Sequence, residues 1–277
     1  PVATYLVAYS SHYEGRLRLP WPCGELLATR RFRAVFSRDQ RTATDLSEQL
    51  RRPVTFLGNP FMDPVLSPTQ PLPDATHRIG LLPGSRRPEL EDNLRLLLAM
   101  VNNLPSDARI TLDLALVTSL ADVDLNPLAT QLGWQLSNAQ LHHPSGTVVH
   151  VRRNAFQAVL QHSDLLVCMA GTAAEQAVGL ARPVLQLPGR GPQFTAAFAE
   201  AQRRLLGPTV FCAPGETGST RNLEESARLA LELLNRSQTD PELQQQCRLE
   251  AERRLGSRGG GRRMAEAISA LAHQQNR

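Results

Sequence analysis

A short turn after an apolar run carries the first residues that could bind an anion. Pro83-Gly84-Ser85-Arg86 follows the apolar run 79–82 and precedes an amphipathic segment. A junction of this kind points free backbone N–H groups and the positive end of a helix at a ligand, and glycine lets the ligand approach the backbone. Arg86 could add a charge-assisted hydrogen bond to a phosphate. The alternative is an ordinary β–α turn in which Ser85 caps the helix and Arg86 is solvated.

A second turn, made of small residues, lies further along the chain. Gly171, Thr172 and Ala173 follow another apolar run and open a helical pattern. Small side chains permit a ligand to come close, and the Thr172 hydroxyl can donate to a phosphate. Glu175 or Gln176, one turn into the helix, could reach sugar hydroxyls. The alternative is close packing of helix on sheet, with Glu175 as a favourable charge near the helix start.

Both turns belong to the same type of junction, at the carboxyl end of an apolar strand. In an open α/β sheet, ligands bind beyond these strand ends, near the point where the strand order reverses. The two turns are separated by about ninety residues, so tertiary folding must bring them together. We therefore expect them to face one crevice.

The rest of the pattern is an α/β protein, because short apolar runs alternate with amphipathic segments. Residues 1–65 carry about three expected strands, at 2–8, 34–37 and 54–57, with a helix over 40–50. A proline-rich connector occupies 66–77, and proline resists regular structure. In the segment 78–255, strands are expected at 79–82, 110–117, 148–151, 165–170 and 184–187. Helices are expected there over 88–104, 154–161, 173–180, 223–235 and 242–255. Residues 256–277 read as a Gly/Arg linker and a last helix over 264–274. The segment 78–255 is long enough for a complete Rossmann-like domain, whereas 1–65 reads as the final part of another.

Composition narrows the possible chemistry. All 30 basic residues are arginine, for a net charge of +4, so no Schiff-base or P-loop lysine is available. Any anion must be bound by arginine or by backbone N–H groups. The four cysteines are scattered and the seven histidines form no metal motif, so we expect no metal site and no other cofactor. The Gly/Arg run 256–263 lacks interleaved aromatic residues, and we expect no nucleic-acid partner. No apolar stretch approaches the ~20 residues of a membrane span, which favours a cytoplasmic protein.

The succession of motifs resembles a known enzyme family. Segment 54–63, then Leu81-Leu-Pro-Gly-Ser-Arg86, then Ala170-Gly-Thr-Ala173, then Arg182-Pro-Val184, is similar to lipid-A-disaccharide synthase along nearly the whole chain. The resemblance implies a two-domain GT-B fold whose C-terminal domain holds the UDP of a sugar donor. It further implies inverting transfer of an acylated glucosamine to a lipid acceptor without a metal, and peripheral contact with the inner membrane.

The same resemblance assigns site residues. Gly84, Ser85 and Arg86 would lie near the donor diphosphate, Gly171, Thr172 and Ala173 would line the same pocket, and Gln176 or Glu175 would meet the ribose. Gln193 would contact the donor sugar, by likeness to a Pro…Asp-Gln stretch of many GT-B enzymes. Asn59 stands at the domain junction, where the family has Gly-His-Pro instead of Gly58-Asn59-Pro60. The family places its base in the first half of the N-terminal domain, so the resemblance implies an N-terminally truncated chain that binds the donor without turnover.

Three functions remain open from the sequence. A glycosyltransferase of the synthase-related group is favoured. An epimerase acting on UDP-N-acetylglucosamine is the second, because Glu175-Gln176-Ala177 resembles the Glu-Glu-Ala of those enzymes. A non-catalytic nucleotide-sugar-binding module is the third.

Overall fold

The N-terminal elements form a small two-stranded unit. The computed structural model describes residues 2–106, 109–189 and 195–275. Its first elements are β1 (Val2–Leu6), α1 (Ser11–Glu14), α2 (Cys23–Ala28), β2 (Phe32–Ser37) and α3 (Gln40–Leu50). β1 and β2 pair in parallel. The N-cap Asp39, whose carboxylate accepts from Thr42 N at 2.7 Å, starts α3 where the sequence predicts it.

The strand expected at 54–57 is reduced to a single bridge between Phe36 and Thr55. Neighbouring polar groups compete for its backbone. The N–H of Val54 donates to Ser47 Oγ at 2.9 Å, and the carbonyl of Leu57 accepts from Arg263 Nε at 2.8 Å. Because these groups are bonded elsewhere, the ladder does not extend.

The larger part of the chain is built on one eight-stranded sheet. Its strands are β3 (His77–Leu82), β4 (Ile110–Leu116), β5 (Gln135–Ser137), β6 (Gln140–His142), β7 (Val148–Arg153), β8 (Leu165–Cys168), β9 (Val184–Gln186) and β10 (Val210–Cys212). They lie in the order β10-β9-β8-β3-β4-β7-β6-β5. Among the described strands, the pairs β5–β6 and β6–β7 are antiparallel and the others are parallel. The parallel core confirms the α/β class. From β3 the chain first adds β4 and β7 on one side, and then adds β8, β9 and β10 on the other side. The strand order therefore reverses at β3.

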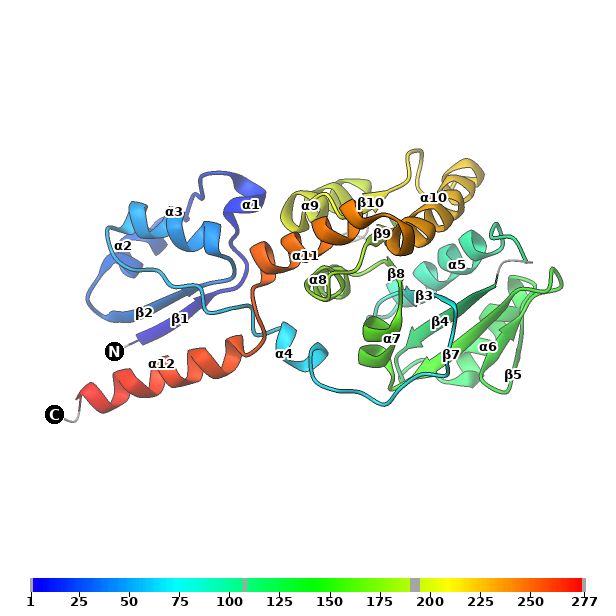
Figure 1. Ribbon diagram of the computed structural model, residues 1–277, viewed down its shortest axis with the longest axis horizontal. Coiled ribbons are helices and arrows are strands. Elements are labelled where there is room, and N and C mark those ends of the chain that lie inside the picture. Colours follow the sequence, from blue (N-terminus) through cyan, green and yellow to red (C-terminus); the bar gives the residue numbers. More distant parts are fainter. Residues whose placement is uncertain (1, 107–108, 190–194, 276–277) are drawn as a thin grey trace.

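Helices cover both faces of this sheet (Figure 1). They are α4 (Met62–Val65), α5 (Glu89–Val101), α6 (Asp122–Gln131), α7 (Phe156–His162), α8 (Gly171–Gly179), α9 (Ala196–Leu206), α10 (Thr220–Thr239) and α11 (Pro241–Leu255). Adjacent residues of β3 serve different cores, since successive strand side chains point to opposite faces. Leu81 packs in the cluster that includes α5 and α10, whereas Leu82 packs in the cluster of α7 and α8.

The last helix, α12 (Gly260–Gln275), leaves the sheet domain and lies beside the N-terminal elements (Figure 1). It begins earlier than the expected 264, because Asp63 accepts from the N–H groups of Gly259 and Gly261 at its start. The segment before α12 is held by hydrogen bonds: Gly256 N donates to Glu252 O at 3.0 Å, and Asn59 N donates to Leu255 O at 2.8 Å. A Cβ on Gly58, whose φ is +91°, would lie 2.7 Å from Ser257 O. Segments 57–63 and 255–261 therefore cross in close contact, where the sequence suggested only a linker.

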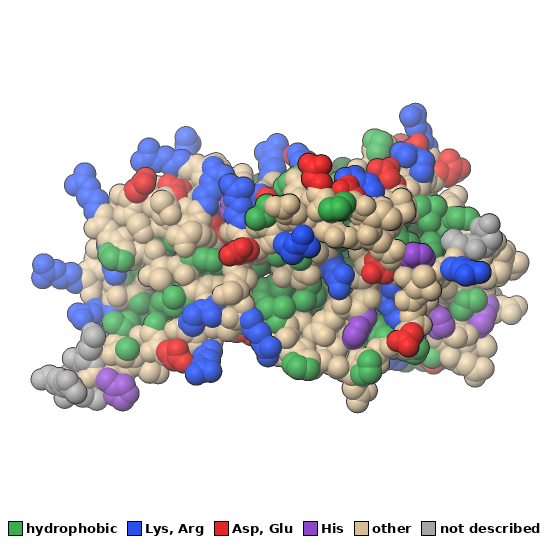
Figure 2. Space-filling view, viewed as in Figure 1, with side chains coloured by type: hydrophobic (Ala, Val, Ile, Leu, Met, Phe, Trp, Pro, Cys, Tyr) green, Lys and Arg blue, Asp and Glu red, His purple; other side chains and the backbone are tan. Residues whose placement is uncertain are grey.

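On the face drawn in Figure 2, arginine side chains are spread over both the N-terminal part and the sheet domain. Within the described ranges, no helix has the length and apolar character needed to cross a membrane.

Candidate functional site

The two turns singled out by the sequence lie side by side. β3 and β8 are adjacent parallel strands with Leu82 opposite Cys168, and Met169 N donates to Leu82 O at 2.9 Å just beyond them. A Cβ on Gly84 would lie 3.7 Å from Ala170 Cβ. Both turns line a single cavity of about 720 Å³. The expected crevice at the strand ends is therefore present.

The structure places most of the expected site residues on this cavity. Its lining includes Gly84, Ser85, Arg86, Gly171, Thr172, Ala173, Glu175 and Gln176. Asn59 contacts the site indirectly, through Glu175. Gln193 lies outside the described residues.

The first turn is shaped by glycine and by a buried amide. Gly84 has φ +105°, a region that residues with a Cβ rarely adopt. Asn93, from α5, donates from Nδ2 to Pro83 O at 2.9 Å and so fixes the turn. Its Oδ1 is buried and has no hydrogen-bond partner in the described part of the chain, and Asn93 itself lines the cavity. The alternative that Ser85 caps the helix is wrong, because α5 begins at Glu89 with Pro88 before it and no side-chain cap.

The second turn is already helical. α8 was expected from Ala173 but begins at Gly171, and its N-cap Ala170 supplies no side-chain hydrogen bond. The first N–H groups of a helix have no partner inside it, so this end presents donors and a positive partial charge at the cavity. Gly171 also allows α9 to approach: a Cβ there would lie 3.2 Å from Phe198 Cζ and from Gln202 Nε2.

Sequence reasoning missed one end of the cavity, formed beyond β4 and β7. Thr118, Asn154 and Phe156 line it. Phe156 is 38% exposed although its side chain is large and apolar. Asn154 has φ +54°, an uncommon backbone conformation that asparagine tolerates better than most residues. The available signal was an aromatic residue three positions after the end of β7.

At the other end, Glu175 accepts two hydrogen bonds from the N-terminal part of the chain. Its Oε1 lies 2.6 Å from Arg38 Nη2 and 2.7 Å from Asn59 Nδ2. Asn59 Oδ1 also accepts from Tyr5 Oη at 3.4 Å. Burial, opposed by Arg38, raises the pKa of Tyr5 to about 12, so this phenol is a neutral donor at physiological pH. The neighbouring Gln176 donates from Nε2 to Phe61 O at 3.0 Å.

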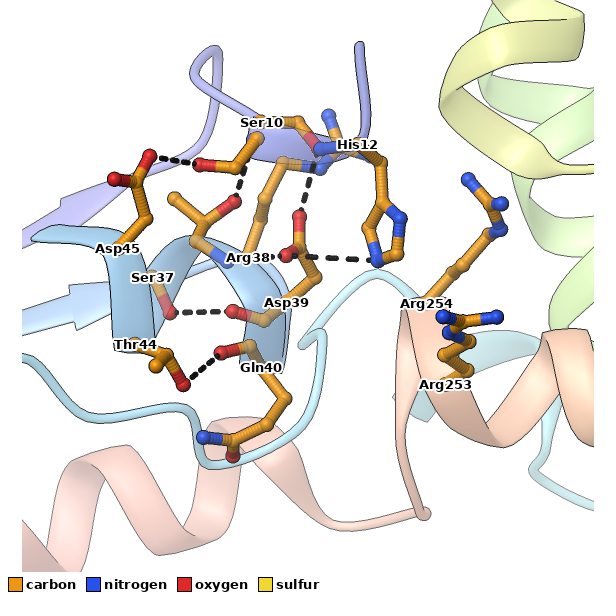
Figure 3. Close-up of polar contacts among 12 residues, drawn as sticks. Ser10, His12, Ser37, Arg38, Asp39, Gln40, Thr44, Asp45, Arg253 and Arg254 are labelled. Atoms are coloured by element: carbon orange, nitrogen blue, oxygen red, sulfur yellow. Dashed lines mark hydrogen bonds and ion pairs between the residues drawn. The ribbon is translucent and has the colours of Figure 1, made fainter. Parts of the chain in front are cut away.

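A polar cluster lies directly behind Arg38 (Figure 3). Asp39 accepts from Ser10 Oγ at 2.8 Å, and His12 Nε2 lies 3.9 Å from Asp39 Oδ1. Burial and the nearby Arg254 lower the pKa of His12 to about 4, so the imidazole is neutral at physiological pH. His12 is not among the residues lining the cavity.

In segments 2–106, 109–189 and 195–275, no three His, Cys, Asp or Glu side chains lie close enough together to hold a metal ion. The groups that the cavity offers to an anion include arginine side chains, backbone N–H groups and the hydroxyl of Thr172.

Comparison with solved structures places this geometry in a known fold. The chain is similar to a UDP-N-acetylglucosamine 2-epimerase from Neisseria meningitidis bound to UDP-GlcNAc, with TM-score 0.55 and 15% identity. It is also similar to a proposed UDP-N-acetylglucosamine 2-epimerase from Listeria monocytogenes, with TM-score 0.54 and 18% identity. A third similar structure is a calicheamicin glycosyltransferase, with TM-score 0.50 and 20% identity. The chain therefore has the α/β fold of GT-B glycosyltransferases and these epimerases.

The matched regions differ in extent. The aligned part covers 98%, 92% and 86% of this chain for the Neisseria, Listeria and calicheamicin proteins, respectively. It spans 76%, 64% and 52% of those proteins. No protein-family model matches the sequence, and no curated protein sequence does.

Proposed function

We propose that the cavity binds the diphosphate of a UDP-sugar and that the chain is the donor-binding part of a glycosyltransferase. The observation that carries this is the convergence of two donor-rich turns, Gly84–Arg86 and Gly171–Ala173, on one cavity at the strand-order reversal. A glycine turn and an uncapped helix start both offer N–H groups to phosphate oxygens. The cavity of about 720 Å³ falls within the size range of cofactor sites.

The sheet order suggests how the ligand is arranged. The ends of β7, β4, β3 and β8 lie along the cavity in that spatial order. Phe156 and the polar Asn154 and Thr118 at the first end suit a flat base with hydrogen-bonding edges. The N–H-rich turns in the middle suit the diphosphate. Beyond them, Gln176 and Gln202 offer amide groups for ribose or sugar hydroxyls.

The chemistry follows from this placement. In inverting transfer, a base takes the proton of the acceptor hydroxyl, whose oxygen attacks the anomeric carbon as the bond to the diphosphate breaks. The enzyme stabilises the departing negative charge. Arg86 and the start of α8 would supply that stabilisation without a metal. By resemblance, the sugar is of the N-acetylglucosamine or acylated glucosamine type and the acceptor is a lipid or saccharide, with the protein peripheral to the inner membrane.

An epimerase acting on UDP-N-acetylglucosamine is the second candidate. The observation that favours it is that the two structures with TM-scores of 0.54 and 0.55 carry that assignment. The two reactions are separable with UDP-N-acetylglucosamine alone. Free UDP together with an epimerised sugar, formed without an acceptor, identifies the epimerase. Transfer requires an acceptor, so with the donor alone neither a transferase nor a binding module forms a product.

Binding itself is tested by calorimetric titration with UDP, with ADP as the competing nucleotide. We expect UDP to bind and ADP to bind at least tenfold more weakly. Arg86→Ala should lower the affinity for UDP by roughly tenfold, because one charge-assisted hydrogen bond is lost. Arg87→Ala is the matched control, because Arg87 is next in sequence but pairs with Glu91 and Asp124 outside the cavity. UDP affinity should agree in EDTA and in Mg²⁺. No UDP binding, or equal loss in both arginine variants, would refute the proposal.

A further inference from the structure

The cavity receives one charged side chain from the N-terminal elements. Among the described residues 2–76, Arg38 alone lines it; the other lining residues belong to the sheet domain. Arg38 follows β2 directly, and its side chain is 9% exposed. The guanidinium therefore brings a positive charge to the ligand site from the opposite side of the cleft.

Two hydrogen bonds fix the position of this guanidinium, and a third anchors the carboxylate that it contacts. Nη2 donates to Glu175 Oε1 at 2.6 Å, and Nη1 donates to Val7 O at 3.1 Å. The same Glu175 oxygen is held by Asn59 Nδ2 at 2.7 Å. Arg38 is thus oriented by a carboxylate that is itself anchored, while both Arg38 and Glu175 remain part of the cavity wall.

The charges of this pair matter for a phosphate ligand. Glu175 lies one turn beyond the start of α8, the helix end proposed to bind the diphosphate. An uncompensated carboxylate there would repel the ligand, and charge interactions are strengthened where water is partly excluded. Arg38 cancels that repulsion, and its guanidinium, which lines the cavity, carries further N–H donors.

From these contacts we infer that Arg38 is an anion-recognition residue for the diphosphate and that Glu175 is the positioning residue that orients it. This inference rests on the proposed function, since it requires a phosphate ligand in the cavity. It assigns Glu175 a task other than the ribose contact implied by the sequence resemblance. The competing role for the pair is purely structural, as an ion pair that joins the two parts of the chain.

The two roles differ in their dependence on ligand charge. We would measure the affinities for UDP by calorimetry and for uridine by displacement of UDP, in four variants. Arg38→Gln removes the cation, Glu175→Gln removes the anion but keeps an acceptor for Asn59, and the double variant leaves no unpaired buried charge. Arg38→Lys retains the charge. Thermal unfolding of each variant without ligand shows whether it is folded.

In the double variant, UDP affinity should fall about tenfold and uridine affinity should change less than about twofold. Glu175→Gln keeps a carbonyl oxygen that can still accept from Arg38 and removes the repelling charge, so it should bind UDP as tightly as the wild type or more tightly. Arg38→Lys should retain most of the preference for UDP over uridine. Equal losses for UDP and uridine, or an unchanged UDP affinity in the double variant, would overturn the role of Arg38 while leaving UDP binding by the wild type intact. If the wild type binds no UDP, the proposed function and this inference both fall.

Discussion

Asp63 accepts a hydrogen bond of 2.8 Å from the N–H of Gly261, and its other carboxylate oxygen accepts from Gly259 at 2.7 Å. This one side chain joins the segment leaving the N-terminal elements to the start of α12, almost two hundred positions away. A carboxylate at a helix start satisfies unpaired N–H groups and interacts favourably with the helix dipole.

Asp63→Ala should therefore loosen α12. We expect a loss of about 1–2 kcal/mol in the free energy of unfolding, the range for removing a helix cap. Amide hydrogen exchange should accelerate in residues 260–275 more than elsewhere. Asp74→Ala, which removes an exposed carboxylate from the connector 66–77, is the control and should change neither quantity. Unaltered exchange in α12 after Asp63→Ala would mean that other contacts hold this helix.

A second prediction concerns the base end of the cavity. Phe156→Ala should weaken the binding of UDP and of uridine equally, by about 1–3 kcal/mol, because stacking on a base does not depend on phosphate. Arg86→Ala should weaken UDP and spare uridine. Parallel titrations of both ligands against both variants measure this contrast. If Phe156→Ala leaves uridine binding unchanged, the base does not lie at the β4–β7 end.

A third prediction concerns a buried ion cluster in the sheet. Asp113 is fully buried and accepts from Arg78 and from Arg152 Nε. Asp113→Leu leaves two guanidinium groups without this partner, and we expect the free energy of unfolding to fall by about 3–5 kcal/mol. Urea denaturation measures the change. Glu91→Gln, which breaks the exposed pair with Arg87, should change it by less than about 1 kcal/mol. Similar effects in the two variants would contradict the distinction between buried and exposed pairs.

A fourth prediction follows from the lowered pKa of His12. The histidine faces Asp39, which favours its charged form, and Arg254, Arg41 and Arg253, which oppose it together with burial. Because the folded-state pKa of about 4 lies below the usual value of 6.5, the unfolded chain binds the proton more readily. Stability from this group is complete above about pH 6.5 and is lost as the pH falls towards 4.

The measurement is urea denaturation at pH 7 and pH 5. Between pH 7 and pH 5, the free energy of unfolding of the wild type should fall by about 1 kcal/mol more than that of His12→Gln, after allowing for solvent screening. His150, whose pKa burial also lowers, is present in both proteins and cancels in the comparison. An identical pH dependence in the two proteins would show that His12 can take up a proton in the folded chain.

Much of the fold was predictable because its signals are local. The buried runs of β3, β8 and β9 and the helical periodicity of α5 and α10 are visible in the sequence, and α3 matches its expected range because Asp39 caps it. The elements without a strong local pattern were missed: α1, α2, α4, α6, α9, β5, β6 and β10. Several of these are only three to six residues long, so tertiary contacts rather than periodicity decide them. The domain limits at 65, 77 and 255 stay predictions.

The residues of the site likewise differ in whether their sequence signal is local or depends on distant contacts. The two turns at strand ends were predictable, since glycine and small residues at such junctions have a direct physical reason. The role of Arg38 was not predictable, because its partner Glu175 is 137 positions away. In a chain with many arginines, the residue type alone does not single out this one. Phe156 was missed because an aromatic residue at a helix start is usually read as core.

The most direct test of the account is hydrogen exchange of the wild-type chain with and without saturating UDP. The account predicts slower exchange in the peptides that contain Gly84–Arg86 and Gly171–Gln176, with little change in residues 220–239 of α10, which packs beneath the sheet. Protection confined to these two turns would locate the diphosphate where the cavity is. Protection elsewhere, or none at saturating UDP, would contradict the central claim.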